Sequence, residues 1–388
     1  MRSNYNPIGK YIRLVDNRNK ELKDLPLVGV TVNKKFIPSV ANTIGTNMKN
    51  YKLIKKHQFA CSLMQVRRDG KIPVALMKDD EAIISQAYPV FEINDTTELL
   101  PEYLMMWMSR SEFDREACFY AVGGVRGSLE WEDFCSMQLP IPSIEKQREI
   151  VKEYHTITDR IKRNERLNQK LEDTAQKKFD NIFNNENDKM EQVRLGDYIE
   201  IKGGFSYHSD GLNKGVAYLL GMGCISFTSR FLEKGMRLYS NDFPEKHLVN
   251  AKDIVIATRQ QSENMPILGY PAMIPSYLEN ESLIVASNLY KVENNSNFSN
   301  EIIYQLLRST NYLEHIKLNR KGTTVGMITK DAVEDFYFNL PTLELISKLD
   351  KKLKSIVKLI FIKRNEIKKL SELKEVLLSK MATVEDIK

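Results

Sequence analysis

The sequence predicts an α+β protein made of one unit that occurs twice: two pseudo-repeated mixed α/β domains joined by two long antiparallel coiled-coil helices. Short motifs recur in the same order in both halves of the 388 residues. Within each half, β-like runs and short helical segments precede a long charged segment without proline or glycine. Self-similarity over so much of a chain indicates an internal repeat, and the mixture of elements indicates the fold class.

The repeat is visible as matched motifs at a constant offset. The dipeptide Leu-Pro at 139–140 recurs at 340–341, 201 residues later. The dipeptide Arg-Asn at 163–164 recurs at 364–365 with the same offset. A glycine-containing stretch ending in Glu-Asp-Phe precedes each Leu-Pro, as GGVRGSLEWEDF and KGTTVGMITKDAVEDF, and IGKYIRL near the start is echoed by LGDYIEI. The shared order of these motifs indicates two copies of one unit.

The first part of each copy has the pattern of a mixed domain, which we place at 1–141 and at 186–341. Runs such as LPLVGVTV, DIVIAT and SLIVASNLYKV are rich in the residues that strands favour. The segments PEYLMMWMSRSEF and NEIIYQLLRSTNYLEHI have helical periodicity, and each comes shortly before its glycine-containing stretch. We therefore expect each domain to end in helices, a glycine loop and the Leu-Pro step.

The second part of each copy predicts a long helix, at 142–185 and at 342–388. Apolar residues follow a narrow three-and-four stripe, interrupted by Asn164 and Asn168, and such a stripe requires a partner helix. Two helices that each cover their own domain would give the same pattern, but we favour pairing of the two copies, with the asparagines fixing the register. The residues expected to pack the helices or to bind a partner are Tyr154, Ile157, Ile161, Leu171, Ile346, Leu349, Leu353, Ile356 and Ile360.

Motifs of catalysis are absent from the sequence. We find no GxxxxGK[ST] phosphate loop, no complete dinucleotide loop and no His spacing typical of a metal site, so we expect no catalytic or metal-binding residues. The four cysteines lie far apart, no run approaches about 20 apolar residues, and the N-terminus lacks the apolar segment of a signal peptide. These features favour a cytoplasmic protein that recognises a partner.

The charge distribution favours a polyanionic partner. The net charge is +6, but residues 1–75 hold 15 Lys and Arg against 4 Asp and Glu, whereas residues 76–142 hold 4 against 13. A basic face opposite an acidic one is expected of a nucleic-acid-binding domain. The alternative is that the two blocks mix on the folded surface and cancel.

The junction between domain and helix carries a resemblance to a known family. The run Pro-x-x-Glu-x-Gln-x-x-Ile is formed by Pro142, Glu145, Gln147 and Ile150, and the helix continues to NQKLEDTAQKKFDNIF. With the pattern repeated, the chain resembles the specificity subunit of type I restriction-modification systems over essentially its whole length. The second copy, PTLELISKL, lacks the glutamine, which leaves its shared role in doubt.

This resemblance implies a non-catalytic targeting subunit. Each mixed domain would be a target recognition domain that reads half of a bipartite site in double-stranded DNA, and the helices would set the gap between the halves. Two modification (methyltransferase) subunits would dock and methylate adenine with S-adenosylmethionine, and restriction subunits would add ATP- and Mg-dependent cleavage. The chain itself would bind no cofactor. The alternative is a stand-alone sequence-specific DNA-binding regulator or scaffold without a methyltransferase partner.

Candidate DNA contacts follow from the side chains that bind bases and phosphates. Arginine and glutamine contact guanine and adenine edges bidentately, and they gather where a β-like run meets a turn in each half. The base-reading candidates are Gln65, Arg67, Arg68, Arg259, Gln260 and Gln261. The backbone-contact candidates are Lys34, Lys35, Lys49, Lys52, Lys55, Lys56, Arg126, Arg320 and Lys321. Solvated surface side chains are the alternative for each of them.

Overall fold

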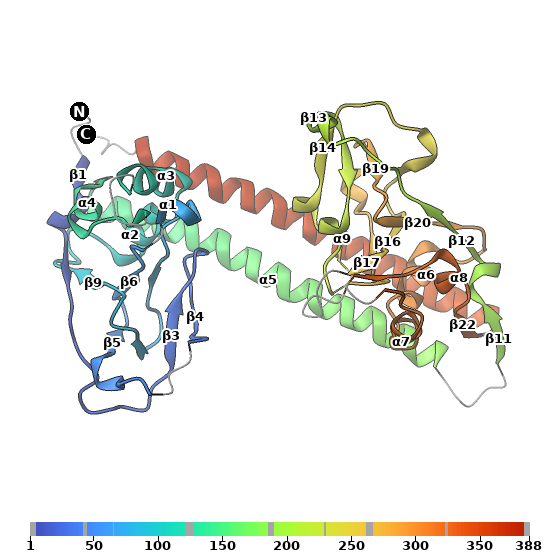
Figure 1. The fold of residues 1–388 in the computed structure, drawn as a ribbon, viewed down its shortest axis with the longest axis horizontal. Helices are drawn as coiled ribbons and strands as arrows, with labels where there is room; N and C mark the ends of the chain where they lie inside the picture. The colour runs from blue at the N-terminus through green and yellow to red at the C-terminus, as the bar shows by residue number, and fades with distance from the viewer. Residues whose placement is uncertain are drawn as a thin grey trace. The chain divides into compact units, whose positions relative to one another are not determined.

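The chain forms two compact units, each made of one mixed domain and parts of two long helices (Figure 1). Unit 1 holds residues 1–161 and 369–388, and unit 2 holds residues 162–368. The computed structural model describes residues 5–41, 45–64, 66–121, 127–184, 190–228, 230–260, 267–322 and 325–383. Within these ranges, no helix is both long and apolar enough to cross a membrane.

The described residues of unit 1 form two four-stranded sheets and one two-stranded sheet. The first sheet has the order β2 (Ile12–Leu14), β9 (Val90–Ile93), β6 (Phe59–Cys61) and β7 (Val74–Leu76), all antiparallel. The second has the order β4 (Phe36–Pro38), β3 (Leu27–Val30), β8 (Glu81–Ile84) and β5 (Lys52–Lys55), with β3 and β8 parallel. Strand β1 (Tyr5–Pro7) pairs with β10 (Gln138–Pro140). The short helices are α1 (Val66–Asp69), α2 (Pro101–Met108), α3 (Ser111–Tyr120) and α4 (Trp131–Ser136).

Unit 2 repeats this topology. Its first sheet has the order β12 (Ile199–Gly203), β20 (Leu289–Asn294), β16 (Ile254–Ala257) and β18 (Pro271–Met273). Its second has the order β14 (Arg237–Tyr239), β13 (Leu212–Leu220), β19 (Leu283–Val285) and β15 (Leu248–Val249), again with one parallel pair, β13 and β19. Strand β11 (Glu191–Arg194) pairs with β22 (Tyr337–Leu340), β17 (Arg259–Gln260) pairs with β21 (Gly326–Met327), and the helices are α6 (Asn300–Leu306), α7 (Thr310–Leu318) and α8 (Lys330–Glu334). The shared strand order confirms the predicted repeat and the α+β class.

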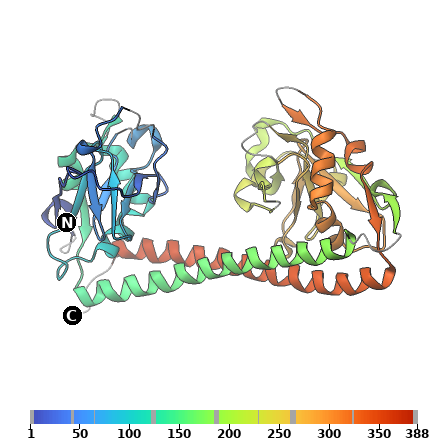
Figure 2. The same cartoon turned by 90° about the horizontal axis from the view of Figure 1, so that it is seen from below.

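Two long helices follow the Leu-Pro steps, which lie at the ends of β10 and β22. Helix α5 (Ile144–Phe183) has 40 residues and α9 (Leu343–Lys380) has 38, because neither sequence contains a proline or glycine that would end it. In unit 2, the ring of Phe183 lies 6.1 Å from that of Phe338, which precedes α9, whereas Glu172 contacts Arg364 near the other end of the α9 segment. The α5 and α9 segments of unit 2 therefore run antiparallel, side by side in both views (Figures 1 and 2).

The apolar stripe of the helices packs on the domains as well as on the other helix. Leu349, Leu353 and Ile360 share one core with strands and short helices of unit 2. Both interpretations of the stripe thus describe part of the packing. The other predicted positions of unit 2 are Ile346, which is buried, and Leu171 and Ile356, which pack against this core; in unit 1, Tyr154 packs against the domain core, and Ile157 and Ile161 are half-buried.

The domain boundaries that we drew from the sequence separate spacer helices from domains. The compact units divide the chain differently, because each domain is grouped with the helix segments packed against it. The boundaries at 141, 185 and 341 stay a prediction about roles.

Candidate nucleic-acid interface

In unit 1, the glycine-containing stretch lies directly against the segment with the base-reading candidates. Gly127 has φ +75°, and a Cβ at this position would lie 3.0 Å from the Cβ of Arg67 on α1. Leu129 N donates a hydrogen bond to Leu63 O at 2.9 Å, which holds the two segments together. Glycine suits this position because the left-handed backbone and the close approach both disfavour a side chain. We call Arg67, Arg68 and Gly127 the first loop surface.

Unit 2 brings the corresponding segments together as a small sheet. In the β17–β21 pair, Arg259 lies opposite Met327 and Gln260 opposite Gly326. Lys321 and Met327 exchange two main-chain N–H to O hydrogen bonds of 2.8 Å, so the strand pairing extends into the glycine-containing stretch. We call Arg259, Lys321 and Met327 the second loop surface.

The base-reading candidates differ in exposure. Arg67, Arg68 and Arg259 are exposed, and Arg68 makes an ion pair of 2.7 Å with its neighbour Asp69. Gln260 is only 7% exposed, so little of its side chain is accessible to DNA in this structure. Gln65 and Gln261 lie outside the described residues.

Two of the predicted phosphate-binding lysines point into unit 1. Lys34 Nζ lies 2.7 Å from Asp114 Oδ1, and burial holds the pKa of Lys34 below its ordinary value. Lys52 Nζ donates to Tyr88 O at 2.9 Å, and burial lowers its pKa as well. Burying a charge is tolerated only with partners, and these partners, distant in sequence, are supplied by the fold. Both lysines are internal here, and this placement argues against a phosphate contact.

The remaining backbone-contact candidates lie mostly on the surface. Arg320 is half-buried, with its guanidinium against Gly326, where it leaves no room for a side chain. Arg126 lies outside the described residues. The exposed candidates are Lys35, Lys49, Lys55, Lys56 and Lys321.

Sequence reasoning missed an exposed apolar side chain at the helix end that precedes the glycine-containing stretch in each unit. Phe119 is 76% exposed near the end of α3, and Leu318 is 86% exposed at the end of α7. Cys118 Sγ contacts Val66 O at 3.5 Å, so this end of α3 lies next to α1. The signal in the sequence was an apolar residue at the end of a helix, just before the glycine-containing stretch.

The helix segments of unit 1 also form an apolar groove. It has a volume of about 380 Å³, and Leu373 and Val376 in its wall are 51% and 48% exposed. Glu153 and Lys380 add opposite charges to the lining. The other lining residues are Thr156, Ile157 and Leu377.

The thiols and acidic groups do not form a reactive or metal-binding centre in the part of the chain that is described. No group of three or more His, Cys, Asp or Glu side chains there could hold a metal ion. Burial raises the pKa of Cys224 to about 12 and raises that of Cys61 as well, which keeps both thiols protonated at neutral pH.

Comparisons with known proteins show the family and the fold of the chain. A family described as type I restriction modification DNA specificity domain matches residues 15–173 and again 187–376. The S subunit of a type I restriction-modification system from M. genitalium has a similar fold, with a TM-score of 0.60 and 13% identity over 99% of this chain and 96% of that one.

A more distant similarity is to the HsdS subunit from Thermoanaerobacter tengcongensis, with 16% identity over 98% of this chain and 97% of that one and a TM-score of 0.38. A comparison with curated proteins gave no significant match. Because the family matches each repeat in turn, the chain belongs to the family of type I restriction-modification specificity proteins, non-catalytic subunits that recognise a DNA sequence.

Proposed function

We propose that the first and second loop surfaces read the two halves of one bipartite DNA site. The observation that supports this most directly is a coincidence between the repeats. In each unit, a segment with exposed arginine and a glycine-containing stretch meet, although Arg67 and Gly127 are 60 residues apart and Arg259 and Met327 are 68 apart. Such a surface joins side chains that specify bases to backbone that approaches DNA closely.

The side chains of these surfaces match the chemistry of base edges and phosphates. Arg67 and Arg259 suit the bidentate contact to guanine, and exposed Lys321 suits a phosphate. Phe119 and Leu318 suit the apolar contact to a thymine methyl group. In this proposal, guanine and thymine are among the bases of the half-sites.

The groove of unit 1 supports docking of the modification subunit. Exposed Leu373 and Val376 together form an apolar wall whose contact with water is unfavourable, and Glu153 and Lys380 also line the groove with opposite charges. An apolar helix of a modification subunit fits such a surface. Two modification subunits per complex would then bind S-adenosylmethionine, and restriction subunits would bind ATP and Mg. The complex would lie in the cytoplasm.

The experiment that tests the proposal is a methylation map. The chain is co-expressed with the methyltransferase encoded beside it, in cells that lack other adenine methylation, and modified adenines are located by single-molecule sequencing. We expect a split motif, two short specific halves around a fixed gap. A soluble complex without methylation would favour the stand-alone regulator instead.

The same map assigns each surface to its half-site. We expect Arg259→Ala with Gln261→Ala to abolish or relax one half of the motif, because base contacts of about 1–3 kcal/mol each are lost. Arg67→Ala with Arg68→Ala should affect the other half. Arg237→Ala, an exposed arginine of β14 outside the second loop surface, is the matched control and should leave both halves intact. An unchanged motif in both double variants would contradict the assignment.

A further inference from the structure

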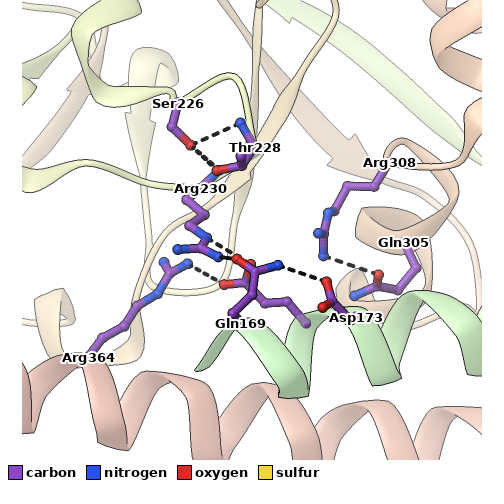
Figure 3. Close-up of polar contacts among 9 residues, drawn as sticks. Gln169, Asp173, Ser226, Thr228, Arg230, Gln305, Arg308 and Arg364 are labelled. Carbon is purple, nitrogen blue, oxygen red and sulfur yellow. Dashed lines mark hydrogen bonds and ion pairs between the residues drawn. The ribbon is translucent and has the colours of Figure 1, made fainter. Parts of the chain in front are cut away.

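A buried carboxylate of helix α5 ties three parts of unit 2 together, and Figure 3 shows its two partners, Arg230 of the domain and Arg364 of α9, pointing toward α5. Glu172 is 3% exposed, and Arg230 Nε donates to its Oε2 at 2.8 Å. Arg364 of α9 donates from its terminal nitrogen to the other oxygen, Oε1, at 2.9 Å. Each carboxylate oxygen thus has its own arginine, one from the domain and one from the second helix. We call Glu172, Arg230 and Arg364 the arginine clamp.

The domain side of the clamp is a closed loop. Ser226 N donates to Arg230 O at 3.0 Å, and Arg230 N donates to Ser226 Oγ at 3.0 Å, so two hydrogen bonds tie the arginine to Ser226. Arg230 also donates to Gln169 Oε1, and Gln169 donates to Asp173 Oδ1 at 2.8 Å. The guanidinium is therefore held by two residues on one face of α5, which limits rotation as well as translation of the loop.

A second polar contact lies one turn further along α9. Lys368 Nζ lies 3.1 Å from Glu233 Oε2, and the Tyr277 hydroxyl donates to Glu233 Oε1 at 2.6 Å. The burial of Tyr277 and its bond to Glu233 raise the pKa of this phenol, so it stays a donor at neutral pH. Arg364 and Lys368, one turn apart on α9, thus each contact a carboxylate, Arg364 that of Glu172 on α5 and Lys368 that of Glu233 in the domain.

Stability alone does not explain a buried ionic clamp. The desolvation of the buried Glu172 carboxylate and of the partly buried arginines offsets much of their attraction, and well-packed apolar side chains of similar volume are often as stabilising or more so. Apolar contacts, however, tolerate small shifts of one surface over another, whereas charge-assisted hydrogen bonds are directional. A buried ionic group is best attested as a device that fixes register.

We infer that the arginine clamp is a positioning device that holds the second domain at one place on its helices, so that the complex accepts only one gap between half-sites. This inference rests on the proposed bipartite recognition. The three residues need not touch DNA. They restrict where the second loop surface can be, and a strict position of that surface means a strict gap.

The experiment measures gap preference in the complex of the full chain with its modification subunit. The substrates carry the two mapped half-sites at the native gap and at gaps one base pair shorter and longer. The variant is Glu172→Leu with Arg230→Met and Arg364→Met, which keeps the volume and removes the directed bonds. The control is Glu200→Leu with Lys202→Met, an exposed ion pair on the sheet of the same domain.

We expect the apolar clamp variant to keep its half-site sequences and its melting temperature, while the ratio of methylation rates at native and altered gaps falls at least tenfold. The control should keep the native ratio. Should the triple variant fail to fold, Arg230→Lys keeps the charge but loses the fork that bonds both Glu172 and Gln169, and its ratio should fall at least threefold.

Two failures can be told apart. A split motif whose gap ratio stays within twofold of native in the folded clamp variant, or in Arg230→Lys, would overturn the clamp inference alone. A map without any split motif would overturn the bipartite proposal and the clamp inference together. A lower melting temperature with an unchanged gap ratio would also contradict the inference, because the clamp would then stabilise the fold without setting the gap.

Discussion

The two units use equivalent positions of their long helices in opposite ways. The offset of 201 residues that relates the repeated Arg-Asn dipeptides also relates Glu172 to Leu373. In unit 2, Glu172 is 3% exposed and holds two arginines. In unit 1, Leu373 is 51% exposed and lines an apolar groove. The same position of the repeat is therefore buried in unit 2 and exposed in unit 1.

This difference teaches that the duplication preserved the backbone more closely than the roles of its side chains. Strand order, the parallel pair and the long helix recur in both units. The helix face is a charged contact in one copy and an apolar surface in the other. An internal contact gains from directed bonds that exclude alternatives, whereas a docking surface gains from apolar area that a partner buries.

The largest expected effect comes from placing charge in the groove of unit 1. Leu373→Asp with Val376→Asp should weaken binding of the modification subunit at least 100-fold, since each apolar side chain that is buried contributes about 1.5–3 kcal/mol. Both residues are half-exposed in the chain, so its own melting temperature should change little. Titration calorimetry with the modification subunit and thermal unfolding of the chain measure the two quantities.

The matched control lies on the same helix in unit 2. Leu359 and Ile362 are 37% and 52% exposed but do not line the groove. Leu359→Asp with Ile362→Asp should leave the affinity within about threefold. Equal losses from both pairs would mean that the whole helix surface, and not the groove of unit 1, carries the docking.

Local patterns in the sequence were sufficient for the fold. The Leu-Pro steps, the absence of proline and glycine beyond them and the apolar stripe predicted two helices, and α5 and α9 are those helices. The duplicated order of motifs predicted two similar domains, and the equivalent sheets confirm them. Such signals depend on residues near one another in the chain, so they can be recognised without knowledge of the tertiary structure.

The candidate interface was predictable only in part, because it depends on contacts between distant segments. The sequence indicated the arginines at 67 and 259 and the glycine-containing stretches, but not that each pair of segments would meet. In the sequence, Lys34 is equivalent to its neighbour Lys35. In the structure, an ion pair with Asp114, 80 residues away, holds Lys34 inside the unit. Sequence alone assigns no partner across such separations.

Gln147 illustrates the same limit from within a family motif. The sequence left its role open because the second copy lacks it. The side chain is fully buried, accepts a hydrogen bond from Leu100 N at 2.9 Å and donates to Glu98 O at 2.8 Å. It therefore fixes the start of α5 to the start of α2 in unit 1, which is a local structural role with no need of a counterpart in unit 2.

An intermediate effect is expected at the glycines, and it should differ between the units. Gly322 has φ +88°, and a Cβ there would lie 2.3 Å from the main-chain oxygen of Val325, which cannot move aside easily. At Gly127 the nearest atom is the Cβ of Arg67, at 3.0 Å. Gly322→Ala should lower methylation at native sites about tenfold and Gly127→Ala a few-fold, since positive φ alone costs about 1–2 kcal/mol.

Gly70→Ala separates strain from contact. Gly70 also has positive φ, +66°, but a Cβ there would meet no atom within 4 Å. Its effect on methylation, measured with the same substrates, should be the smallest of the three. If Gly127→Ala proved as harmful as Gly322→Ala, the second loop surface would not be the more tightly packed one.

The smallest expected effect concerns the asparagines in the helix stripe, and it is one of stability. Asn164 and Asn168 are 5% and 4% exposed, and among the described residues Asn164 Nδ2 and Asn168 Oδ1 have no hydrogen-bond partner. A buried unpaired polar atom costs about 1–3 kcal/mol, so Asn164→Leu should raise the free energy of unfolding by about 1 kcal/mol in urea titrations. Asn365→Leu, at the repeat-equivalent and half-exposed position, should not raise it.

The gap assay applied to Asn164→Leu decides which polar group fixes the register of unit 2. The asparagine lies two turns before Glu172 on α5, and among the described residues its Nδ2 donates no directed bond that could hold the second domain. The arginine clamp has such bonds, so we expect the stabilised variant to keep the native gap preference. A relaxed gap in Asn164→Leu with an intact clamp would instead assign the register to the helix seam, as in coiled coils whose alignment depends on one buried asparagine.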